Sequence, residues 1–278
     1  MFGKEYGGHL DILIQSFGQI NQQYKRKIKK DNIFTEKLKN LYVLLFGIPE
    51  IGFQIRSMYV KRFLISYLAN KNFNKILDAG SGIGAYTILL AKNFPEAKVT
   101  AIDINKNKLK SSADIANELK IENVEFLYLN ITKLQDRPVY DFIINVDVLE
   151  HLNDYEEVLR NFFKLLKKDG YLYIHVPQPN QKRIFSFFKT WHHEEHMREG
   201  IVKTDLENAL KQLTFKIVES RETFGFFGKL SWEINHFMLS NSFLFAGITF
   251  PFLFALASFD LFFKNKNGLG IAILAQKN

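Results

Sequence analysis

A glycine-rich turn between a short apolar run and a helical stretch holds the residues of this sequence that are best suited to bind a ligand. Ile76 and Leu77 lead to the acid Asp78, and glycines follow at positions 80, 82 and 84 before an apolar stretch with helical character begins. Glycine is needed in such a turn where a Cβ atom would block a positive φ angle or the approach of a ligand. The N–H groups at the start of the following helix can then donate to that ligand. The pattern predicts a strand, a tight turn and a helix around a binding site.

The acid at position 78 favours one kind of ligand over another. Gly80, Gly82 and Ala85 also satisfy the G-x-G-x-x-G/A pattern of dinucleotide-binding proteins, so the glycines alone leave both kinds open. A carboxylate two residues before the first glycine would repel a pyrophosphate, but it suits a ligand that carries an ammonium group. Residues 78–84, D-A-G-S-G-I-G, resemble motif I of the class I S-adenosylmethionine-dependent methyltransferases. The resemblance implies that Asp78 faces the methionine end of S-adenosyl-L-methionine.

Polar residues end the next predicted strands. A short apolar run ends at Asp103, roughly 20 residues after the glycines, where Rossmann-like folds bind ribose hydroxyls. A third run, 124–129, precedes Asn130, whose amide can both donate and accept, and methyltransferases often bond the adenine amino group at this position. A fourth run covers residues 140–146. The resemblance implies a cofactor site formed by Asp78, Gly80, Ser81, Gly82, Gly84, Asp103, Ile104, Asn130, Ile131, Asn145 and Val146.

The order of strands and helices predicts the fold class. Strands alternate with helices from residue 75 to residue 176, which indicates a parallel sheet with helices on both faces. Capping boxes at Asp154 with Glu157 and at Thr204 with Glu207 predict helices over 155–168 and about 204–213. Residues 170–176 and 215–223 read as the fifth and sixth strands. Resemblance to the class I family implies an α/β, Rossmann-like, doubly wound seven-stranded sheet whose last strand, 270–275, is antiparallel.

The resemblance is strongest over residues 75–180. The passage from D-V-L-E-H-L, 147–152, to K-K-D-G-Y-L-Y-I-H-V-P, 167–177, resembles small-molecule methyltransferases of the ubiquinone-biosynthesis and glycan-tailoring type. We expect four segments: an N-terminal helical cap (1–74), the cofactor-binding core (75–224), an apolar helical insertion (225–266) and the last core strand (267–278). In the cap, Ile51 and Ile55 begin a four-residue apolar repeat that predicts an amphipathic helix. This helix either closes over the cofactor as a lid or packs on the sheet edge.

The insertion is rich in phenylalanine. No Asp, Glu, Lys or Arg occurs from His236 to Phe259, and the stretch 243–259 is long enough for a membrane span. Pro251 in its middle and Asp260 before two further phenylalanines argue against a simple span. The alternatives are a helix pair resting in the membrane interface over 236–263, a groove for an apolar substrate, or a homodimer contact. Lys264 and Lys266 beside the apolar stretch favour an anionic membrane surface.

The composition of the chain excludes some kinds of chemistry and disfavours some classes of partner. The chain has 278 residues, a net charge of +8 and no cysteine, so disulfides and thiolate chemistry are excluded. The positive residues are scattered and no RNA-binding module is apparent, which makes nucleic acid a poor partner. Lys4, Glu5 and His9 interrupt the region where a secretion signal would need an apolar run. Because S-adenosylmethionine is made in the cytosol, we expect a cytoplasmic protein, at the cytoplasmic face of a membrane if one is bound.

Two histidines are the candidate catalytic residues. His151 follows the fourth strand at the edge where ligands bind in such sheets, and His196 with Arg198 resembles an H-x-R motif of many relatives. Either could act as the base that methyl transfer to oxygen or nitrogen requires. We expect no metal site. The alternative is Mg²⁺ at Asp147, Glu150 and His151, a D-x-x-E-H pattern that resembles the E-x-x-E-H of some ubiquinone-pathway O-methyltransferases.

These features predict S-adenosylmethionine-dependent methyl transfer to a small or lipid- or glycan-linked acceptor, with oxygen as the expected methylated atom. A second interpretation is a non-catalytic cofactor-binding subunit that serves assembly or regulation. A third, less favoured, is an RNA methyltransferase.

Overall fold

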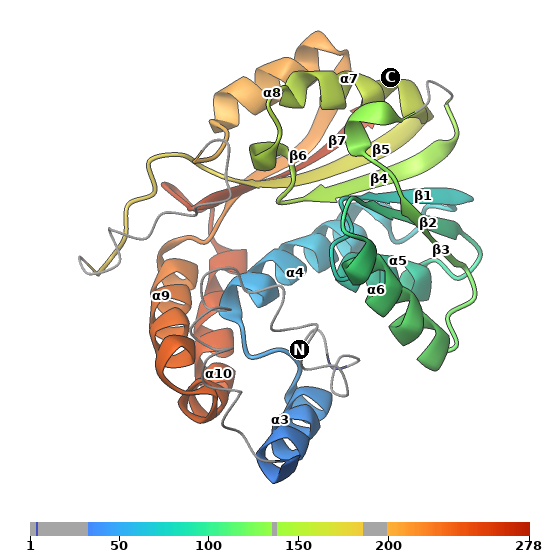
Figure 1. The fold of residues 1–278 in the computed structure, drawn as a ribbon. Helices are drawn as coiled ribbons and strands as arrows, with labels where there is room; N and C mark the ends of the chain where they lie inside the picture. The colour runs from blue at the N-terminus through green and yellow to red at the C-terminus, as the bar shows by residue number, and fades with distance from the viewer. Residues whose placement is uncertain (1–3, 5–32, 135–137, 186–198) are drawn as a thin grey trace. The chain divides into compact units, whose positions relative to one another are not determined.

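The computed structural model describes residue 4 and residues 33–134, 138–185 and 199–278, and the chain forms two compact units (Figure 1). The helical unit comprises Met1–Arg62, Lys182–His193 and Thr223–Gly268. The sheet unit comprises Phe63–Gln181, Glu194–Glu222 and Leu269–Asn278. The four segments expected from the sequence stay a prediction.

The described part of the sheet unit contains one seven-stranded sheet, with the strand order β3-β2-β1-β4-β5-β7-β6. Strands β1 to β5 pair in parallel, and β7 pairs with β5 in the antiparallel direction, which confirms the predicted fold class. The strands are β1 (Lys75–Ala79), β2 (Lys98–Asp103), β3 (Val124–Tyr128), β4 (Tyr140–Val146), β5 (Leu166–Pro177), β6 (Phe215–Thr223) and β7 (Gly270–Lys277).

Helices cover both faces of this sheet. Figure 1 shows α7 and α8 on one face and α5 and α6 on the other. These helices are α5 (Ala85–Asn93), α6 (Lys106–Glu118), α7 (Tyr155–Leu165) and α8 (Lys203–Gln212), and the short helices are η2 (Leu64–Leu68), η3 (Ile131–Lys133) and η4 (Leu149–His151).

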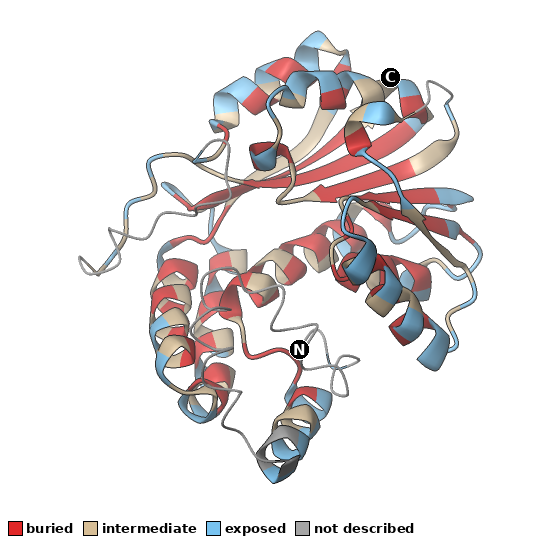
Figure 2. Cartoon of the chain, in the orientation of Figure 1, coloured by how far each residue is buried: buried red, intermediate tan, exposed pale blue. Residues whose placement is uncertain are grey.

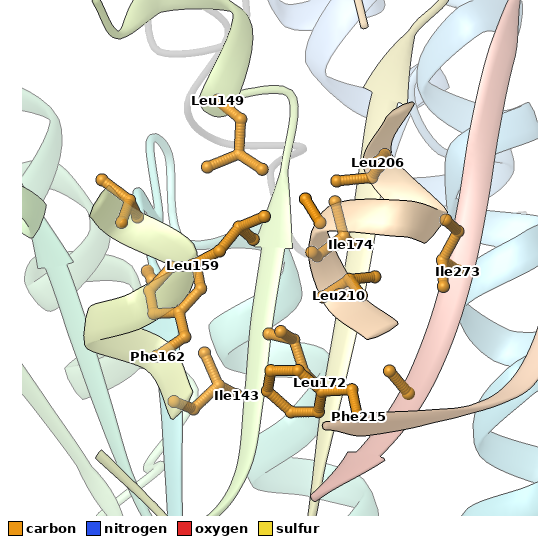
Figure 3. Close-up of a cluster of buried hydrophobic side chains, with 14 of the residues drawn as sticks. Ile143, Leu149, Leu159, Phe162, Leu172, Ile174, Leu206, Leu210, Phe215 and Ile273 are labelled. Atoms are coloured by element: carbon orange, nitrogen blue, oxygen red, sulfur yellow. The ribbon is translucent and has the colours of Figure 1, made fainter. Parts of the chain in front are cut away.

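The core between the sheet and the α7–α8 layer follows from helical periodicity. In α7, Val158, Leu159, Phe162 and Leu165 recur at three- or four-residue spacing and are all buried. Figure 3 shows Leu159 and Phe162 beside Ile143 of β4, with Leu206 and Leu210 of α8 beside Ile174 and Ile273. Since these side chains exclude water on that face, the strand ends are held in fixed positions.

Helix α7 confirms its predicted start but ends earlier than the sequence indicates. Asp154 caps it, because its side chain accepts a hydrogen bond from the Glu157 N–H at 2.9 Å. The helix stops at Leu165 instead of Lys168, because Leu166 is extended and pairs with Tyr140 of β4. The Lys167 ammonium group then binds the Asp141 carboxylate at 2.7 Å and does not lie over a helix end. Strand β5 therefore begins four residues before Gly170.

The predicted capping box at Thr204 is wrong. Helix α8 begins at Lys203, after Val202, and its first residue has no side-chain cap. The Glu207 carboxylate instead accepts a hydrogen bond from the Ser220 hydroxyl of β6 at 2.6 Å. The Glu207 side chain thus bonds a residue of a neighbouring strand and does not cap the start of its own helix.

The helical unit contains α3 (Ile33–Phe46), α4 (Ile51–Phe63, whose last residue falls in the sheet unit), α9 (Phe226–Asn241), α10 (Phe243–Ser258) and η6 (Phe259–Phe262). In α4 the predicted apolar repeat is buried, with Ile51, Ile55 and Tyr59 at most 2% exposed. Helices α9 and α10 lie side by side and are separated only by Ser242. Figure 2 shows that α3, α9 and α10 carry exposed as well as buried residues. In the described residues one helix, Phe243–Phe262, is long and apolar enough to cross a membrane by length and composition, and 33% of it is buried.

Candidate functional site

The predicted site residues lie at or directly after the carboxyl ends of four neighbouring strands. Strand β1 lies between β2 and β4, and all three run in parallel, so Ala79, Asp103 and Val146 end at the same edge. Strands β2 and β3 lie on one side of β1, and β4 lies on its other side, so the strand order reverses at β1. In open α/β sheets such a reversal of strand order is where ligands bind.

The three glycines of the turn have different roles, although all have positive φ angles of 83°, 54° and 73°. A Cβ atom at Gly80 would collide with the side chain of Val148, and one at Gly84 would lie 2.8 Å from the Cβ atom of Ser112. These two glycines are therefore needed for packing. A Cβ atom at Gly82 would have no heavy atom within 4 Å beyond its chain neighbours, so this glycine borders open space.

Asp103, the last residue of β2, binds the glycine turn through a hydrogen bond. One of its carboxylate oxygens accepts a hydrogen bond from the Gly82 N–H at 2.8 Å, and the other accepts one from the Asn105 N–H at 2.8 Å. The N–H group of Gly82 is thus hydrogen-bonded within the protein. Because a carboxylate has about four acceptor positions, Asp103 keeps acceptor capacity for the two hydroxyls of a ribose.

Asp78 is buried below the turn, with 2% of its surface exposed. The Thr87 hydroxyl of α5 donates a hydrogen bond to its carboxylate at 2.6 Å. Burial raises the pKa of Asp78 to about 7, and the negative charge of Asp103 adds to this increase, while the bond from Thr87 opposes it. The group therefore titrates near neutrality, and a cation placed beside it would favour its charged form.

Apolar side chains are exposed beside Asp103. Ile104 is 67% exposed, Tyr128 at the end of β3 is 56% exposed, and Leu129 is 42% exposed. The ring of Tyr128 and the apolar surfaces of the other two side chains suit an aromatic base. The sequence identified Ile104 but not Tyr128 or Leu129, although their place directly before Asn130 was an available signal.

The two residues predicted after β3 differ in exposure. Asn130 is exposed, and its side-chain oxygen accepts hydrogen bonds from the backbone N–H and the hydroxyl of Thr132, both at 3.0 Å. The side-chain NH₂ group of Asn130 can therefore donate hydrogen bonds to a ligand. Ile131 is 6% exposed and packs in the core of the sheet unit, so its side chain does not face a ligand.

Two buried polar atoms at this edge have no hydrogen-bond partner among the described residues. They are the Ser81 hydroxyl oxygen and the side-chain oxygen of Asn145, whose amide nitrogen donates to the Ala79 carbonyl at 2.7 Å. Val146 follows and is partly exposed. Since buried polar atoms are nearly always satisfied in proteins, these two indicate that a polar ligand or water binds beside the turn.

A histidine that the sequence did not single out lies at the end of β5. His175 is 2% exposed, and its Nδ1 atom lies 2.6 Å from the Asp147 carboxylate. Asp147 itself has a φ angle of 53°, and its N–H donates to the His175 carbonyl at 2.9 Å. The buried ring therefore fixes the carboxylate at the sheet edge. The pairing was hidden in the sequence because it depends on the register of β4 against β5.

His151 lies in η4, directly after β4, and its side chain is 37% exposed. Its Nε2 atom is 4.0 Å from the Glu150 carboxylate, which is 1% exposed. The histidine is thus accessible and has a buried acid beside it. Asp147, Glu150 and His151 do not converge as an ion would require, and the described residues contain no group of three potential metal ligands. His196 and Arg198 lie outside the described residues.

Comparison with known proteins agrees with this geometry. A family model described as a methyltransferase domain matches residues 70–233, which is more than half of the chain. A malonyl-[acyl-carrier protein] O-methyltransferase of Bacillus anthracis is 37% identical over 106 residues, 38% of this chain and 38% of the relative. An (S)-coclaurine N-methyltransferase of Thalictrum flavum subsp. glaucum is 31% identical over 104 residues, 37% of this chain and 29% of the relative. The chain thus spans about a third of the length of these curated relatives.

A solved structure shares the fold. The phosphoethanolamine N-methyltransferase 2 of Haemonchus contortus, in complex with S-adenosyl-L-methionine, superimposes with a TM-score of 0.60 at 19% identity, over 85% of this chain and 56% of that chain. The relatives include N- and O-methyltransferases, so the comparison leaves the methylated atom open. The chain belongs to the methyltransferase domain family, and its fold is that of the solved methyltransferase in complex with S-adenosyl-L-methionine.

Proposed function

We propose that this protein transfers the methyl group of S-adenosylmethionine to an oxygen atom of an acceptor that is either a small molecule or linked to a lipid or a glycan. The observation that carries the proposal is the arrangement of Asp78, the glycine turn and Asp103 at the switch point of the sheet. Two carboxylates flank a turn that borders open space at Gly82.

The residues present fit this cofactor. Asp78 suits the ammonium group of the methionine end, because a cation stabilises the charged form of a buried acid. The Asp103 carboxylate suits the ribose hydroxyls, and Ile104 with Tyr128 offers apolar faces to the adenine. The unpaired Ser81 hydroxyl gives a further polar contact. Three further residues hold the turn in place. Gly80 and Gly84 allow close packing, and the Asn145 amide donates a hydrogen bond to the Ala79 carbonyl.

When bound, S-adenosylmethionine supplies an electrophilic methyl group on a sulfonium. The protein must hold the acceptor oxygen in line with it and receive the acceptor's proton. We assign the acceptor's proton to His151, which is exposed after β4 and lies beside the buried Glu150 carboxylate. Held by Asp78 and Asp103, the cofactor would supply the methyl carbon and a sulfur that can depart as a neutral thioether. His196 stays the second candidate for this role.

A lipid-linked acceptor is supported by the apolar insertion. Phe252 is 77% exposed and Phe262 is 82% exposed, and such side chains on a cytoplasmic enzyme suit a substrate that is anchored in a membrane. We propose that the protein works at the cytoplasmic face of a membrane, with peripheral contact through residues 236–263.

A labelled methyl group tests the proposal. The purified protein is incubated with lipid and glycan-intermediate extracts and with methyl-deuterated S-adenosylmethionine, and products are followed by mass spectrometry. We expect one labelled methyl group on an extractable metabolite, lost in the Asp103→Ala variant. His151→Ala should keep cofactor affinity and lower turnover. A parallel incubation contains RNA in place of the extracts, and cofactor binding without a labelled product in either incubation would instead support the non-catalytic subunit.

A further inference from the structure

Helix α10 has an apolar face that is exposed along its whole length. The exposed positions recur every three or four residues and continue into η6, so they form one stripe. They are Leu244, Ile248, Phe252, Ala255, Phe259 and Phe262. The opposite face is buried in the helical unit, through Ala246, Phe250, Leu253 and Ala257. A helix that is apolar all round normally has apolar surroundings on every side.

Helix α3 packs against α10 and adds a second exposed apolar face. The Tyr42 hydroxyl donates a hydrogen bond to the Gly247 carbonyl at 2.8 Å, and the Tyr42 ring meets the Phe243 ring edge-on at 6.0 Å between centroids. A side chain at position 247 would come within 3.3 Å of the Tyr42 ring, so glycine permits this close approach. The exposed apolar residues of α3 are Phe34, Leu38, Leu41, Leu44, Leu45 and Phe46.

A proline explains why these two helices join at this point. Pro251 lies inside α10 and has no N–H, so it cannot donate to the carbonyl of residue 247, four positions earlier. The Tyr42 hydroxyl fills that position. The α3 contact thus repairs the backbone bond that the proline removes.

The charges around the stripe are positive. Residues 223–268 are all described, and their two acids, Glu233 and Asp260, are at most 2% exposed. Glu233 accepts hydrogen bonds from two backbone N–H groups at 2.9 Å, and Asp260 accepts one from the Gly228 N–H at 2.8 Å. The exposed charged residues of this segment are Lys264 and Lys266, directly after the phenylalanines.

We propose that the outer faces of α3 and α10 together form a docking surface for an anionic lipid bilayer, with α10 lying along the membrane plane. Phenylalanines would enter the acyl boundary while Lys264 and Lys266 meet the lipid phosphates. The inference rests on the proposed membrane contact and deepens it by adding α3, which the sequence placed in the N-terminal helical cap.

The buried contacts of α9 favour this orientation over a span. Asn235 of α9 accepts a hydrogen bond from the Ile51 N–H at 2.9 Å and donates one to the Pro49 carbonyl at 3.1 Å. These bonds, with the buried carboxylate of Glu233, hold α9 within the folded unit. Because α10 follows α9 after one residue and packs along it, only the outer face of α10 is free to enter lipid.

Vesicle flotation tests the proposal with the full-length protein. We expect the wild-type protein to float with phosphatidylcholine–phosphatidylglycerol vesicles, less with phosphatidylcholine alone, and less when salt rises from about 0.1 to about 0.5 M. Phe252→Ser should lower vesicle partitioning by about tenfold, since one large apolar side chain is lost from lipid. Ile65→Ser is the matched control, because Ile65 is 73% exposed but lies in the sheet unit, and it should change nothing.

Variants of α3 distinguish a membrane surface formed by α3 and α10 from one formed by α10 alone. Leu41→Ser with Leu44→Ser should also lower partitioning by about tenfold or more. If these leave flotation unchanged while Phe252→Ser abolishes it, α10 alone contacts the membrane and the two-helix surface is wrong. A wild-type protein that stays with the soluble fraction, or one that sediments as a dimer dispersed by Phe252→Ser, overturns the membrane surface altogether. Calorimetric binding of S-adenosylhomocysteine, measured in parallel, shows whether the methyltransferase assignment survives either failure.

Discussion

The affinity for the cofactor should depend on pH through Asp78. Its carboxyl group has a pKa of about 7 in the folded protein, because it is buried, against an ordinary value of 3.8. The difference corresponds to about 4 kcal/mol against the charged form. A ligand ammonium group needs that charged form, so binding must be accompanied by loss of a proton below pH 7.

The expected size of the effect follows directly. At about pH 5.5 roughly 97% of the Asp78 groups are protonated, so the dissociation constant should be about 30-fold higher than the plateau above pH 8. Isothermal titration calorimetry with S-adenosylhomocysteine, in buffers of different ionisation enthalpy, measures both the affinity and the released proton. Asp78→Asn should bind weakly at every pH and release no proton.

Thr87 provides the matched control. Thr87→Val removes the 2.6 Å hydrogen bond that lowers the Asp78 pKa, so the midpoint of the pH dependence should move upward, while Thr87→Ser should keep it. A dissociation constant that is flat from about pH 5.5 to 8 in the wild-type protein would refute the assignment of Asp78 to the ammonium group.

Asp78 also changes the free energy of unfolding with pH, in the opposite direction to most carboxyl groups. Its folded pKa lies above its unfolded pKa, so the folded protein binds the proton more tightly. The stabilisation is complete below about pH 4 and is lost as the pH rises to about 7. Cofactor binding should therefore raise the melting temperature more at neutral pH than at about pH 5.5.

Three further predictions concern other contacts. Asp103→Ala should weaken cofactor binding about 30-fold or more by calorimetry, since two hydroxyls lose a charged acceptor, with a smaller loss for Asp103→Asn; equal affinities would mean that the ribose binds elsewhere. His175→Gln should lower kcat and leave the cofactor dissociation constant nearly unchanged, because the buried ring fixes Asp147, which begins the segment that carries His151; an unchanged kcat contradicts this role. Tyr42→Phe should cost about 1–3 kcal/mol of unfolding free energy in urea, and less in a Pro251→Ala background, where residue 251 regains its N–H; equal costs in both backgrounds would disprove the link between tyrosine and proline.

The sequence predicted most of the sheet because local patterns specify it. Apolar runs that end in Asp78 and Asp103, and the capped helix after Asp154, each depend on a few neighbouring residues. The end of α7 was not predictable in this way, since Leu166 joins β5 only through its pairing with Tyr140. A basic pair near a predicted helix end looks like a favourable dipole interaction, but Lys167 binds a strand residue instead.

Features of the site that depend on strand register were also hidden. His175 and Asp147 are 28 residues apart and meet because Val146 pairs with His175 across β4 and β5. Similarly, the sequence showed that Gly82 lies in a turn but not that its N–H is used by Asp103, 21 residues later. Residue types revealed the kind of ligand, whereas the partners of each polar group required the folded chain.

The bond between Tyr42 and Gly247 gives an otherwise uniform apolar contact a defined alignment. Apolar side chains alone could pack in more than one register, whereas the hydrogen bond from the Tyr42 hydroxyl to the Gly247 carbonyl forms in one register. Burial raises the pKa of Tyr42 to about 12, so the hydroxyl keeps its proton and remains a donor throughout the physiological range. Pro251 leaves the Gly247 carbonyl, in the middle of α10, without its helical donor, and the Tyr42 hydroxyl of α3 binds there. Insertions or deletions that shift Tyr42 by one position should therefore misplace α3 even if its apolar character is preserved.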